Sequence, residues 1–542
     1  MHGAGTVTGT KAARRAGWLS PKRWLSPTRR SAGRRTPVAL LVLGAAVVAG
    51  LMLPLAFLVL QAAQAGGGEL SRLLFRQLTL TLLWNTVKLV VVVTAACAVI
   101  GTATAWVTER SSLPGRRVVA ALLVLPVAVP DFVIAWGWAS LFPSLSGLAG
   151  AALVLTLGLY PLVYLPVAAS FRRADAAQEY VARSLGRGPW RTFLSVTLPQ
   201  ARLAVTGGCL LVALYLLAEY GAFSVLRYQT FTTEIFAEFQ QGFDAPAAAA
   251  LSLVVVALGI VLLVGEAAAT RPGRAALGRP RPQAGVLVVL GRATAPVVAG
   301  VGALVALAVG VPAAMILYWA ASGQRTTLPA ASSLAGAAWH TALYSGSAAA
   351  MATVAALPVA VLAVRHRRWP IVVMERAGLL VEALPGLVVA LALVFFAARY
   401  APLAYQSGPL LVVAYGIMFF PLALVAVRAS MARVPTELEA VGRSLGRHPL
   451  SVALRVTLPL LMPGLLASFL LVFMTAATEL PATLVLVPTG VQTLATQFWA
   501  YTGDFSYRAA APFAAAMLVV AVVPSYLLGR WFDRLPSGAV GR

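Results

Sequence analysis

Long apolar stretches alternate with short polar ones along the whole chain. In the first half, runs long enough to cross a bilayer as helices lie near residues 37–62, 84–108, 118–142, 148–171, 202–223 and 246–269. The second half repeats the pattern near 295–319, 339–364, 377–398, 408–428, 460–481 and 509–529. We therefore expect an all-α polytopic membrane protein of about twelve transmembrane helices, arranged as two six-helix repeats.

The polar stretches set the expected domain boundaries. Residues 1–36 carry nine Lys or Arg and no acidic residue, which is typical of a disordered cytoplasmic tail. The first apolar run is longer than the 7–15 residues of a signal peptide, so we interpret it as an uncleaved span. The chain then divides into a first repeat (37–269), a linker rich in Arg, Pro and Gly (270–294), a second repeat (295–535) and a short tail (536–542).

One polar segment occurs twice with the same internal spacing. Residues 179–186 read Glu-Tyr-Val-Ala-Arg-Ser-Leu-Gly, and residues 439–446 read Glu-Ala-Val-Gly-Arg-Ser-Leu-Gly. Val-Thr-Leu-Pro follows each copy, at 196–199 and 456–459, so that every paired position differs by 260 (439 − 179 and 459 − 199). Chance does not hold such a register over twenty residues. The chain therefore contains an internal duplication.

Each copy predicts a polar helix-turn-helix between apolar spans. Gly186 and Gly446 should end the first helix in a left-handed conformation, and a Pro three residues later suits the first turn of the second helix. The Leu-Pro pairs that end at Pro199 and Pro459 predict the end of that second helix.

Within the first helix of each copy, a Glu precedes an Arg by four residues. These pairs, Glu179 with Arg183 and Glu439 with Arg443, have the order that favours an ion pair along a helix. Such a pair stabilises a helix by only about 0.2–0.5 kcal/mol. We therefore expect replacement of either Glu to have little effect on folding.

The Glu-x-x-Ala/Gly-x-x-x-Gly frame that ends in Leu-Pro resembles the EAA loop of the permease subunits of ABC importers, here with both permease halves on one chain. In that family the loop is the coupling helix that docks into a groove of the cytoplasmic ATPase. The resemblance implies two copies of this ATPase and an external or lipid-anchored substrate-binding protein as partners. The alternative is a pair of amphipathic surface helices without a partner. The residues implied in docking are Glu179, Arg183, Gly186, Pro199, Glu439, Arg443, Gly446 and Pro459.

Composition and charge agree with a bilayer protein. Hydrophobic residues make up 60% of the chain and charged residues 11%, against about 25% charged in soluble proteins. The net charge is +25, and the basic residues lie between the apolar runs and at the ends of the chain rather than on one soluble face. This distribution argues against nucleic-acid binding. An even number of spans per half makes the repeats parallel. We therefore expect a multi-pass protein of the bacterial inner membrane with both loops and both termini in the cytoplasm.

Residues that could support catalysis or hold a cofactor are scarce. The P-loop pattern is absent, because the only lysines are Lys11, Lys22 and Lys88 and none follows a glycine. The four histidines are scattered, and Cys97 and Cys209 lie inside apolar runs, so no metal site is firmly assigned. We expect no enzyme activity and no cofactor in this chain, with ATP and magnesium bound by the partner ATPase.

Three acidic residues are candidates for a substrate path. Glu219 and Glu479 are 260 apart, each near the outer end of the span that follows an EAA segment, and carboxylates inside a membrane are usually functional. Both could instead cap a helix or reach the interface. Pro130 and Pro385 interrupt the third and ninth spans; Asp131 follows Pro130, whereas Gly386 follows Pro385, so the acidic set is not symmetric. A purely structural role is the alternative for Asp131.

The surroundings of these glutamates sharpen the resemblance. Residues 479–484, 492–496 and 230–234 are similar to segments of ferric-iron importer permeases. Fe³⁺ is a hard cation that prefers oxygen ligands. Ferric iron is therefore the leading substrate, with thiamine, phosphonate or another small solute as alternatives in the same class. A two-repeat secondary transporter and a membrane scaffold remain alternatives from other classes.

Overall fold

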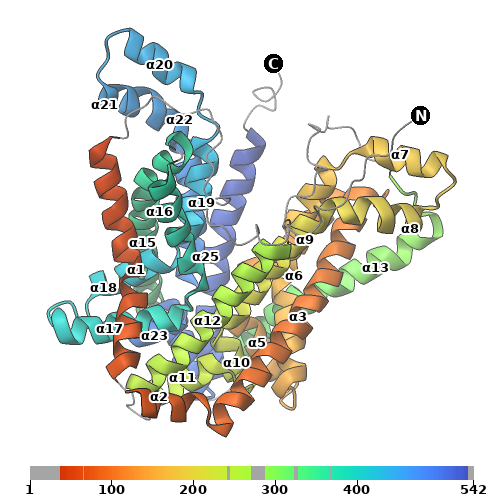
Figure 1. The fold of residues 1–542 in the computed structure, drawn as a ribbon. Helices are drawn as coiled ribbons and strands as arrows, with labels where there is room; N and C mark the ends of the chain where they lie inside the picture. The colour runs from red at the N-terminus through yellow and green to blue at the C-terminus, as the bar shows by residue number, and fades with distance from the viewer. Residues whose placement is uncertain are drawn as a thin grey trace, which may run out of the picture.

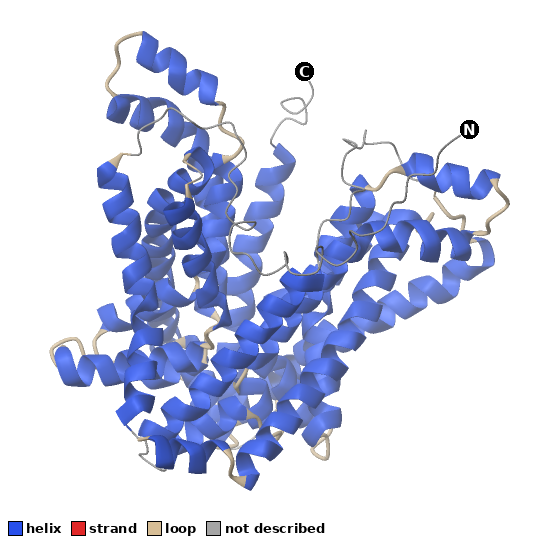
Figure 2. Ribbon diagram, viewed as in Figure 1, coloured by secondary structure: helices blue, strands red, loops and turns tan. Residues whose placement is uncertain are grey.

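The computed structural model describes residues 37–64, 66–240, 245–269, 287–322, 328–366 and 368–534. Figure 2 shows these residues as helices joined by short loops, as predicted. The extended pairing in the described ranges is one isolated bridge between Ser111 and Val288. The two predicted tails and linker residues 270–286 lie outside the described residues.

The helices follow the predicted duplication. Those of the first half are α1 (Val38–Gln64), α2 (Gly67–Leu74), α3 (Gln77–Arg110), α4 (Arg116–Val124), α5 (Asp131–Leu141), α6 (Gly147–Arg173), α7 (Ala176–Ser184), α8 (Pro189–Thr192), α9 (Leu198–Ala218), α10 (Gly221–Val225), α11 (Phe231–Gln240) and α12 (Ala245–Ala269). Those of the second half are α13 (Thr294–Val305), α14 (Val311–Ala321), α15 (Ala331–Arg365), α16 (Trp369–Leu380), α17 (Gly386–Tyr400), α18 (Gly408–Met418), α19 (Phe420–Met431), α20 (Thr436–Ser444), α21 (Pro449–Val452), α22 (Leu458–Ala477), α23 (Pro481–Leu486), α24 (Leu494–Gly503) and α25 (Tyr507–Arg534).

Eight helical segments are long and apolar enough to span a membrane, and three bent helix pairs raise the number to eleven if each pair counts as one span. Two bends, of 91° and 103°, lie where Pro130 and Pro385 interrupt the predicted third and ninth spans. The predicted run at 509–529 falls on α25, whose described apolar part, Tyr507–Val523, is shorter than the others. The described helices thus give eight to eleven candidate spans, against about twelve predicted.

The predicted helix breaks at the two Leu-Pro pairs are wrong. Helix continues from Pro189 to Ala218 and from Pro449 to Ala477. A π-helical turn precedes each proline, at Phe193–Thr197 and Ala453–Thr457. The wider π-helical turn changes the backbone hydrogen-bond pattern beside the proline, which has no N–H to donate. The helix therefore continues through the proline.

The two repeats interlock. Helix α1 of the first half packs against α15, α16 and α17 of the second, and α14 of the second half packs against α5 of the first. The buried cores mix in the same way, because α14, α24 and α25 contribute side chains to the core around α5 and α6. Residues of α1, α11 and α12 contribute to the core around α15, α17 and α19. Each repeat therefore completes its core with helices of the other.

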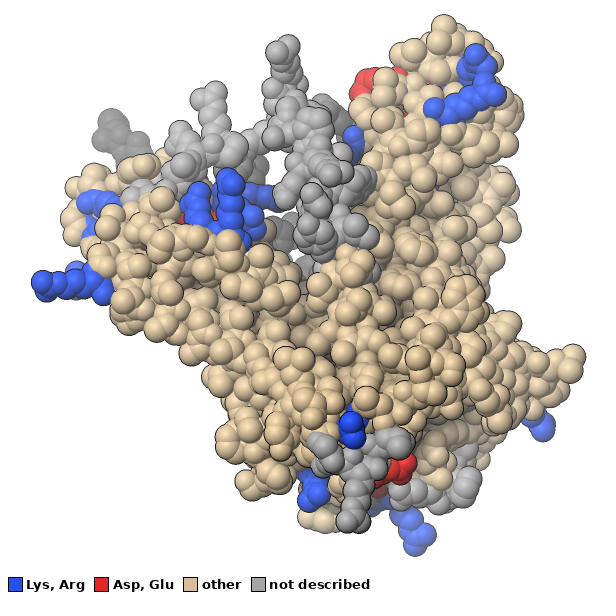
Figure 3. Space-filling view, turned by 180° about the vertical axis from the view of Figure 1, so that it is seen from behind, with Lys and Arg blue, Asp and Glu red and all other residues tan. Residues whose placement is uncertain are grey.

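The molecule has two lobes that meet at one end and diverge at the other (Figure 1). The short helices α7 and α8 end one lobe, and α20 and α21 end the other, both on the diverging side, which we call the loop end. Helix α1 starts and α25 finishes at this end too. On the face in Figure 3, charged side chains lie toward the two ends and leave an uncharged band between them, as expected of a membrane protein.

Candidate functional sites: two EAA loops and a group of buried carboxylates

The EAA loops, residues 175–199 and 435–459, have the predicted backbone at their glycine turns. Gly186 has a φ of 78° and Gly446 a φ of 75°, in the left-handed region that favours glycine. A Cβ added at either position would meet no atom within 4 Å. These glycines are therefore required by the backbone conformation rather than by lack of space. Each is followed by a helix that starts at a proline, as predicted.

The glutamate of the first EAA loop points into the protein. Glu179 Oε1 lies 3.1 Å from Arg110 Nη2 at the end of α3, and both side chains are only 4% exposed. The Thr197 hydroxyl donates a hydrogen bond of 2.9 Å to the same oxygen. The predicted pair with Arg183 is wrong, because the Glu179 side chain faces the end of α3 instead of the next turn of its own helix.

The second EAA loop repeats this arrangement. Arg365 Nη2, at the end of α15, donates a hydrogen bond of 2.8 Å to Glu439 Oε1 and another of 2.9 Å to the carbonyl of Val434. The predicted pair between Glu439 and Arg443 is wrong for the same reason. In both copies the motif glutamate anchors the loop to a long helix of its own repeat, α3 in the first and α15 in the second.

Our sequence reasoning missed the two anchoring arginines, although the sequence holds a signal for them. Arg110 and Arg365 are 255 apart and stand at the ends of the second and eighth apolar runs. Trp84 and Trp339, which open these runs, differ by the same 255. A repeat alignment extended from the tryptophans would have paired the arginines.

A strand-like segment covers the ion pair of the first EAA loop. The Val288 amide donates to the Arg110 carbonyl at 2.9 Å, and the Ser112 amide donates to the Val288 carbonyl at 3.0 Å. Val288 belongs to the stretch between the repeats and lines a small cavity together with Arg110 and Glu179. In the second loop, Arg365 bonds to Val434 of its own repeat instead. Val288 of the linker thus covers the Arg110–Glu179 ion pair of the first EAA loop.

Both EAA loops expose apolar side chains at equivalent positions. Four pairs, each 260 apart, are between 54% and 75% exposed: Val181 and Val441, Leu185 and Leu445, Trp190 and Leu450, Leu194 and Leu454. Exposed apolar patches of this kind mark sites of contact with another protein or with a membrane.

The structure places Glu219 and Glu479 as helix caps. Glu219 Oε1 accepts a hydrogen bond from the Ala222 amide at 2.7 Å, and Glu479 Oε1 accepts one from the Ala482 amide at 3.2 Å. Glu219 is buried and Glu479 partly buried. Capping is therefore part of their role.

The loops that follow the two glutamates touch each other. A Cβ at Gly221 would lie 3.0 Å from Leu480. Aromatic rings continue this junction, since Phe498 of α24 lies 5.6 Å from Phe132 and 5.5 Å from Trp136, measured between ring centroids. The two repeats therefore meet closely where the lobes join.

Asp131 starts α5 and is 5% exposed, and its Oδ2 has no hydrogen-bond partner. Its Oδ1 lies only 2.3 Å from where a Cβ of Gly158 would be. In the second repeat the residues are exchanged, because Met418 fills the space over Gly386. In the second repeat the Met418 thioether thus takes the place of the Asp131 carboxylate, and Glu479 Oε1 also lies 2.9 Å from where a Cβ of Gly386 would be. Among the described residues, no group of three or more Asp, Glu, His or Cys could hold a metal ion.

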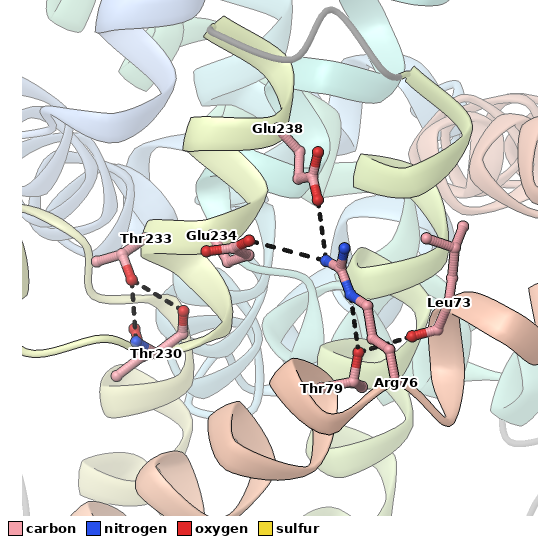
Figure 4. A network of polar contacts seen from close by, with 7 residues as sticks. All are labelled: Leu73, Arg76, Thr79, Thr230, Thr233, Glu234 and Glu238. Carbon is pink, nitrogen blue, oxygen red and sulfur yellow. Dashed lines mark hydrogen bonds and ion pairs between the residues drawn. The ribbon is translucent and has the colours of Figure 1, made fainter.

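A polar network lies at the end opposite the loops (Figure 4). Arg76 Nη2 is 2.9 Å from Glu238 Oε1 and 3.7 Å from Glu234 Oε1, both on α11. Partial burial raises the pKa of Glu234, the neighbouring Glu238 raises it further, and Arg76 lowers it. Counting from Thr230 and Thr493, which directly precede α11 and α24, Gln497 of the second repeat stands where the first has Glu234.

Known proteins match both repeats. Residues 97–268 and 352–537 match the family described as binding-protein-dependent transport system inner membrane component. The Fe(3+)-transport system permease protein FbpB 2 of Haemophilus influenzae is 35% identical over 506 residues, covering 92% of this chain and 99% of that protein. The sulfate permease protein CysT of Escherichia coli is 29% identical over 235 residues, 39% of this chain and 84% of its own length.

A third relative has a similar extent. The molybdate/tungstate permease protein WtpB of Pyrococcus furiosus is 26% identical over 226 residues, 41% of this chain and 90% of its own length. Relatives of this kind span about one repeat, whereas FbpB 2 spans both. The chain therefore belongs to the family of binding-protein-dependent inner-membrane components of ABC importers, and it carries the permease domain twice.

Proposed function

We propose that this chain is the two-repeat permease of an ATP-driven importer for ferric iron that an external binding protein delivers. The proposal rests on the 35% identity of this chain, across 92% of its length, to a relative whose name specifies Fe(3+) transport. The sulfate and molybdate/tungstate relatives match only about two fifths of this chain. Iron is therefore favoured over these oxyanions.

The loop end faces the cytoplasm in this proposal, together with both termini. The basic residues of segments 172–202 and 428–455 lie at this end, in agreement with the positive-inside rule. The lobes diverge toward the same end, which suits a path that opens to the cytoplasm.

Each EAA loop docks one copy of a cytoplasmic ATPase. The two loops lie on separate lobes, and each exposes the same four apolar positions. The ion pairs to Arg110 and Arg365 fix the loops to long helices, so a movement of the bound ATPase is transmitted to these helices. ATP and magnesium belong to the partner, because this chain has no P-loop sequence.

Ferric iron passes between the repeats beside Glu219, Glu479 and Asp131. Hard cations prefer carboxylate oxygens, and two glutamates at equivalent places in parallel repeats flank the axis between them. The unpartnered Oδ2 of Asp131 supports a role beyond packing, because a buried polar atom without a partner is costly.

Docking is tested by charge on the apolar loop faces. The variant Leu185→Asp/Leu445→Asp should insert normally and lose the copurifying ATPase. Leu403→Asp is the matched control, because Leu403 is 99% exposed and lies outside both loops. Unchanged ATPase association in the double variant would contradict the docking assignment.

The substrate is tested by uptake of radioactive iron in cells that lack other iron systems, with sulfate, molybdate, thiamine and phosphonate as competitors. Glu219→Gln/Glu479→Gln should reduce iron uptake while ATPase binding persists. Wild-type uptake by this variant would restrict both residues to capping. Uptake that persists with a hydrolysis-deficient ATPase would instead indicate a secondary transporter.

A further inference from the structure

A cavity of about 580 Å³ opens on the first repeat between α3, α10 and α11, at the end away from the EAA loops. This volume is typical of sites for small molecules. Its lining includes Asn85, Tyr220, Phe223, Arg227, Tyr228 and Phe236. Among the described residues that line it, Arg227 alone carries a charge and none is acidic. The cavity therefore favours an anion.

Arg227 has a backbone conformation that suits glycine better. Its φ is 54°, in the left-handed region that side chains with a Cβ rarely adopt. Arg227 lies three residues before Thr230, which precedes α11, and Gly490, with a φ of 84°, lies three residues before Thr493, which precedes α24. The second repeat thus uses glycine where the first keeps arginine. Backbone strain of this kind concentrates at functional sites. We therefore interpret Arg227 as a residue whose side chain has a function.

The loop around Arg227 is held firmly on α3. The Tyr228 hydroxyl donates to the Asn85 carbonyl at 2.9 Å, and Asn85 Nδ2 donates to the Gln229 carbonyl at 3.2 Å. Arg227 forms no ion pair with any acidic residue of the described ranges. Its guanidinium is therefore positioned at the cavity and available to a ligand.

We propose that this cavity binds a small organic anion with carboxylate groups. The planar guanidinium of Arg227 pairs with a carboxylate through two parallel hydrogen bonds, and the aromatic walls cover the carbon skeleton. The site goes beyond the proposed iron transport and does not depend on it. It lies next to the proposed path, because Tyr220 of its wall directly follows Glu219.

The test is calorimetric titration of the purified full chain with citrate, in the absence of iron, with sorbitol as a neutral probe of similar size. The wild type should bind citrate and not sorbitol. Arg227→Gln should weaken citrate binding at least about tenfold, because a charge-assisted bidentate contact is lost. Arg399→Gln is the matched control, since Arg399 is an exposed arginine of the second repeat outside this cavity.

Arg227→Gly keeps the test decisive if the glutamine variant folds poorly. Glycine suits the left-handed backbone, so this variant should melt at or above the wild-type temperature and still lose citrate binding. Absence of citrate binding by the wild type, or equal affinity of wild type and Arg227→Gly, overturns the proposal. Iron uptake is measured separately, so failure here leaves the transport assignment untouched.

Discussion

The two EAA loops share a fold and differ in how their anchors are protected. In the first loop the Arg110–Glu179 pair is 4% exposed on both sides and Val288 of the linker closes it. In the second loop the Arg365–Glu439 pair is 9% and 13% exposed. The same motif therefore forms a deeply buried ion pair in one repeat and a more accessible one in the other.

This difference follows from the fusion of the two repeats. The linker must leave α12 and reach α13, and its residues around Val288 pass the end of α3 on the way. The linker enters only once, between the repeats, so only one loop can be covered by it. Removing one partner from a buried ion pair leaves an uncompensated charge, and the penalty grows with burial. The duplicated motif should therefore respond unequally to the same substitution.

The largest effect is expected for Glu179→Ala compared with Glu439→Ala. Loss of Glu179 leaves Arg110 charged and buried, which should lower the free energy of unfolding by about 3–5 kcal/mol, in contrast to the small effect expected for a pair along one helix. Loss of Glu439 should cost less, since Arg365 is more exposed and keeps its bond to Val434. Chemical denaturation of both variants in detergent measures the difference.

The control for this comparison removes the charge of both partners. Arg110→Met/Glu179→Leu should recover most of the stability, because a buried ion pair can be replaced by apolar side chains of similar size. Equal losses for Glu179→Ala and Glu439→Ala would show that burial does not distinguish the two anchors.

The second prediction concerns the linker contact. Val288→Pro removes the amide that donates to the Arg110 carbonyl, so stability should fall by about 0.5–1.5 kcal/mol, the net contribution of one hydrogen bond. Coupling of ATP hydrolysis to transport should weaken at the first loop only. Combining Val288→Pro with Leu185→Asp or with Leu445→Asp distinguishes the two loops. Coupling should be weaker in the double variant with Leu445→Asp than in Leu445→Asp alone, whereas adding Val288→Pro to Leu185→Asp, which already disables the first loop, should change nothing.

The sequence was sufficient for features that depend on short spacings. The left-handed Gly186 and Gly446, the helix starts after them and the breaks at Pro130 and Pro385 all follow from local backbone chemistry. The ion-pair partners of Glu179 and Glu439 could not be predicted in this way. An Arg four residues away is a plausible local partner, and only tertiary packing brings Arg110 and Arg365 to the two glutamates.

Other features could not be predicted because they depend on the local or tertiary context of single residues. The prolines at 199 and 459 were expected to end helices, but a π-helical turn accommodates each one. The contact of Val288 with α3 joins segments far apart in the chain that share no sequence pattern. The exchange of Asp131 over Gly158 for Met418 over Gly386 likewise becomes visible only when α5 is packed on α6 and α17 on α18.

The third prediction is an effect that should be equal in both loops. Gly186→Ala and Gly446→Ala force a Cβ into the left-handed conformation, which costs about 1–2 kcal/mol, and no neighbouring atom adds to this cost. Thermal unfolding should therefore shift by the same amount in both variants. Asn should be tolerated better than Ala, because it adopts this conformation more readily. Unequal shifts would mean that the loops differ in backbone as well as in burial.

The smallest effect is expected where the first repeat is made to match the second at the opposite end. Glu234→Gln places on α11 the residue that Gln497 provides on α24. Burial and Glu238 raise the pKa of Glu234 above its unfolded value, so the native state holds this proton more tightly and its ionisation destabilises the fold as the pH rises through that pKa. The substitution removes this cost, while Arg76 keeps its closer contact with Glu238 at 2.9 Å.

The wild-type melting temperature should therefore decline slightly as the pH rises from about 4 through the raised pKa of Glu234, and the Glu234→Gln profile should be flatter. The change should not exceed about 1 kcal/mol, because the ion pairs are partly exposed. Glu238→Gln is the contrasting control: it removes the shorter ion pair to Arg76 and should lower the melting temperature at neutral pH. If Glu234→Gln destabilises the protein as much as Glu238→Gln does, the 3.7 Å contact of Glu234 with Arg76 outweighs the effects of burial and of Glu238.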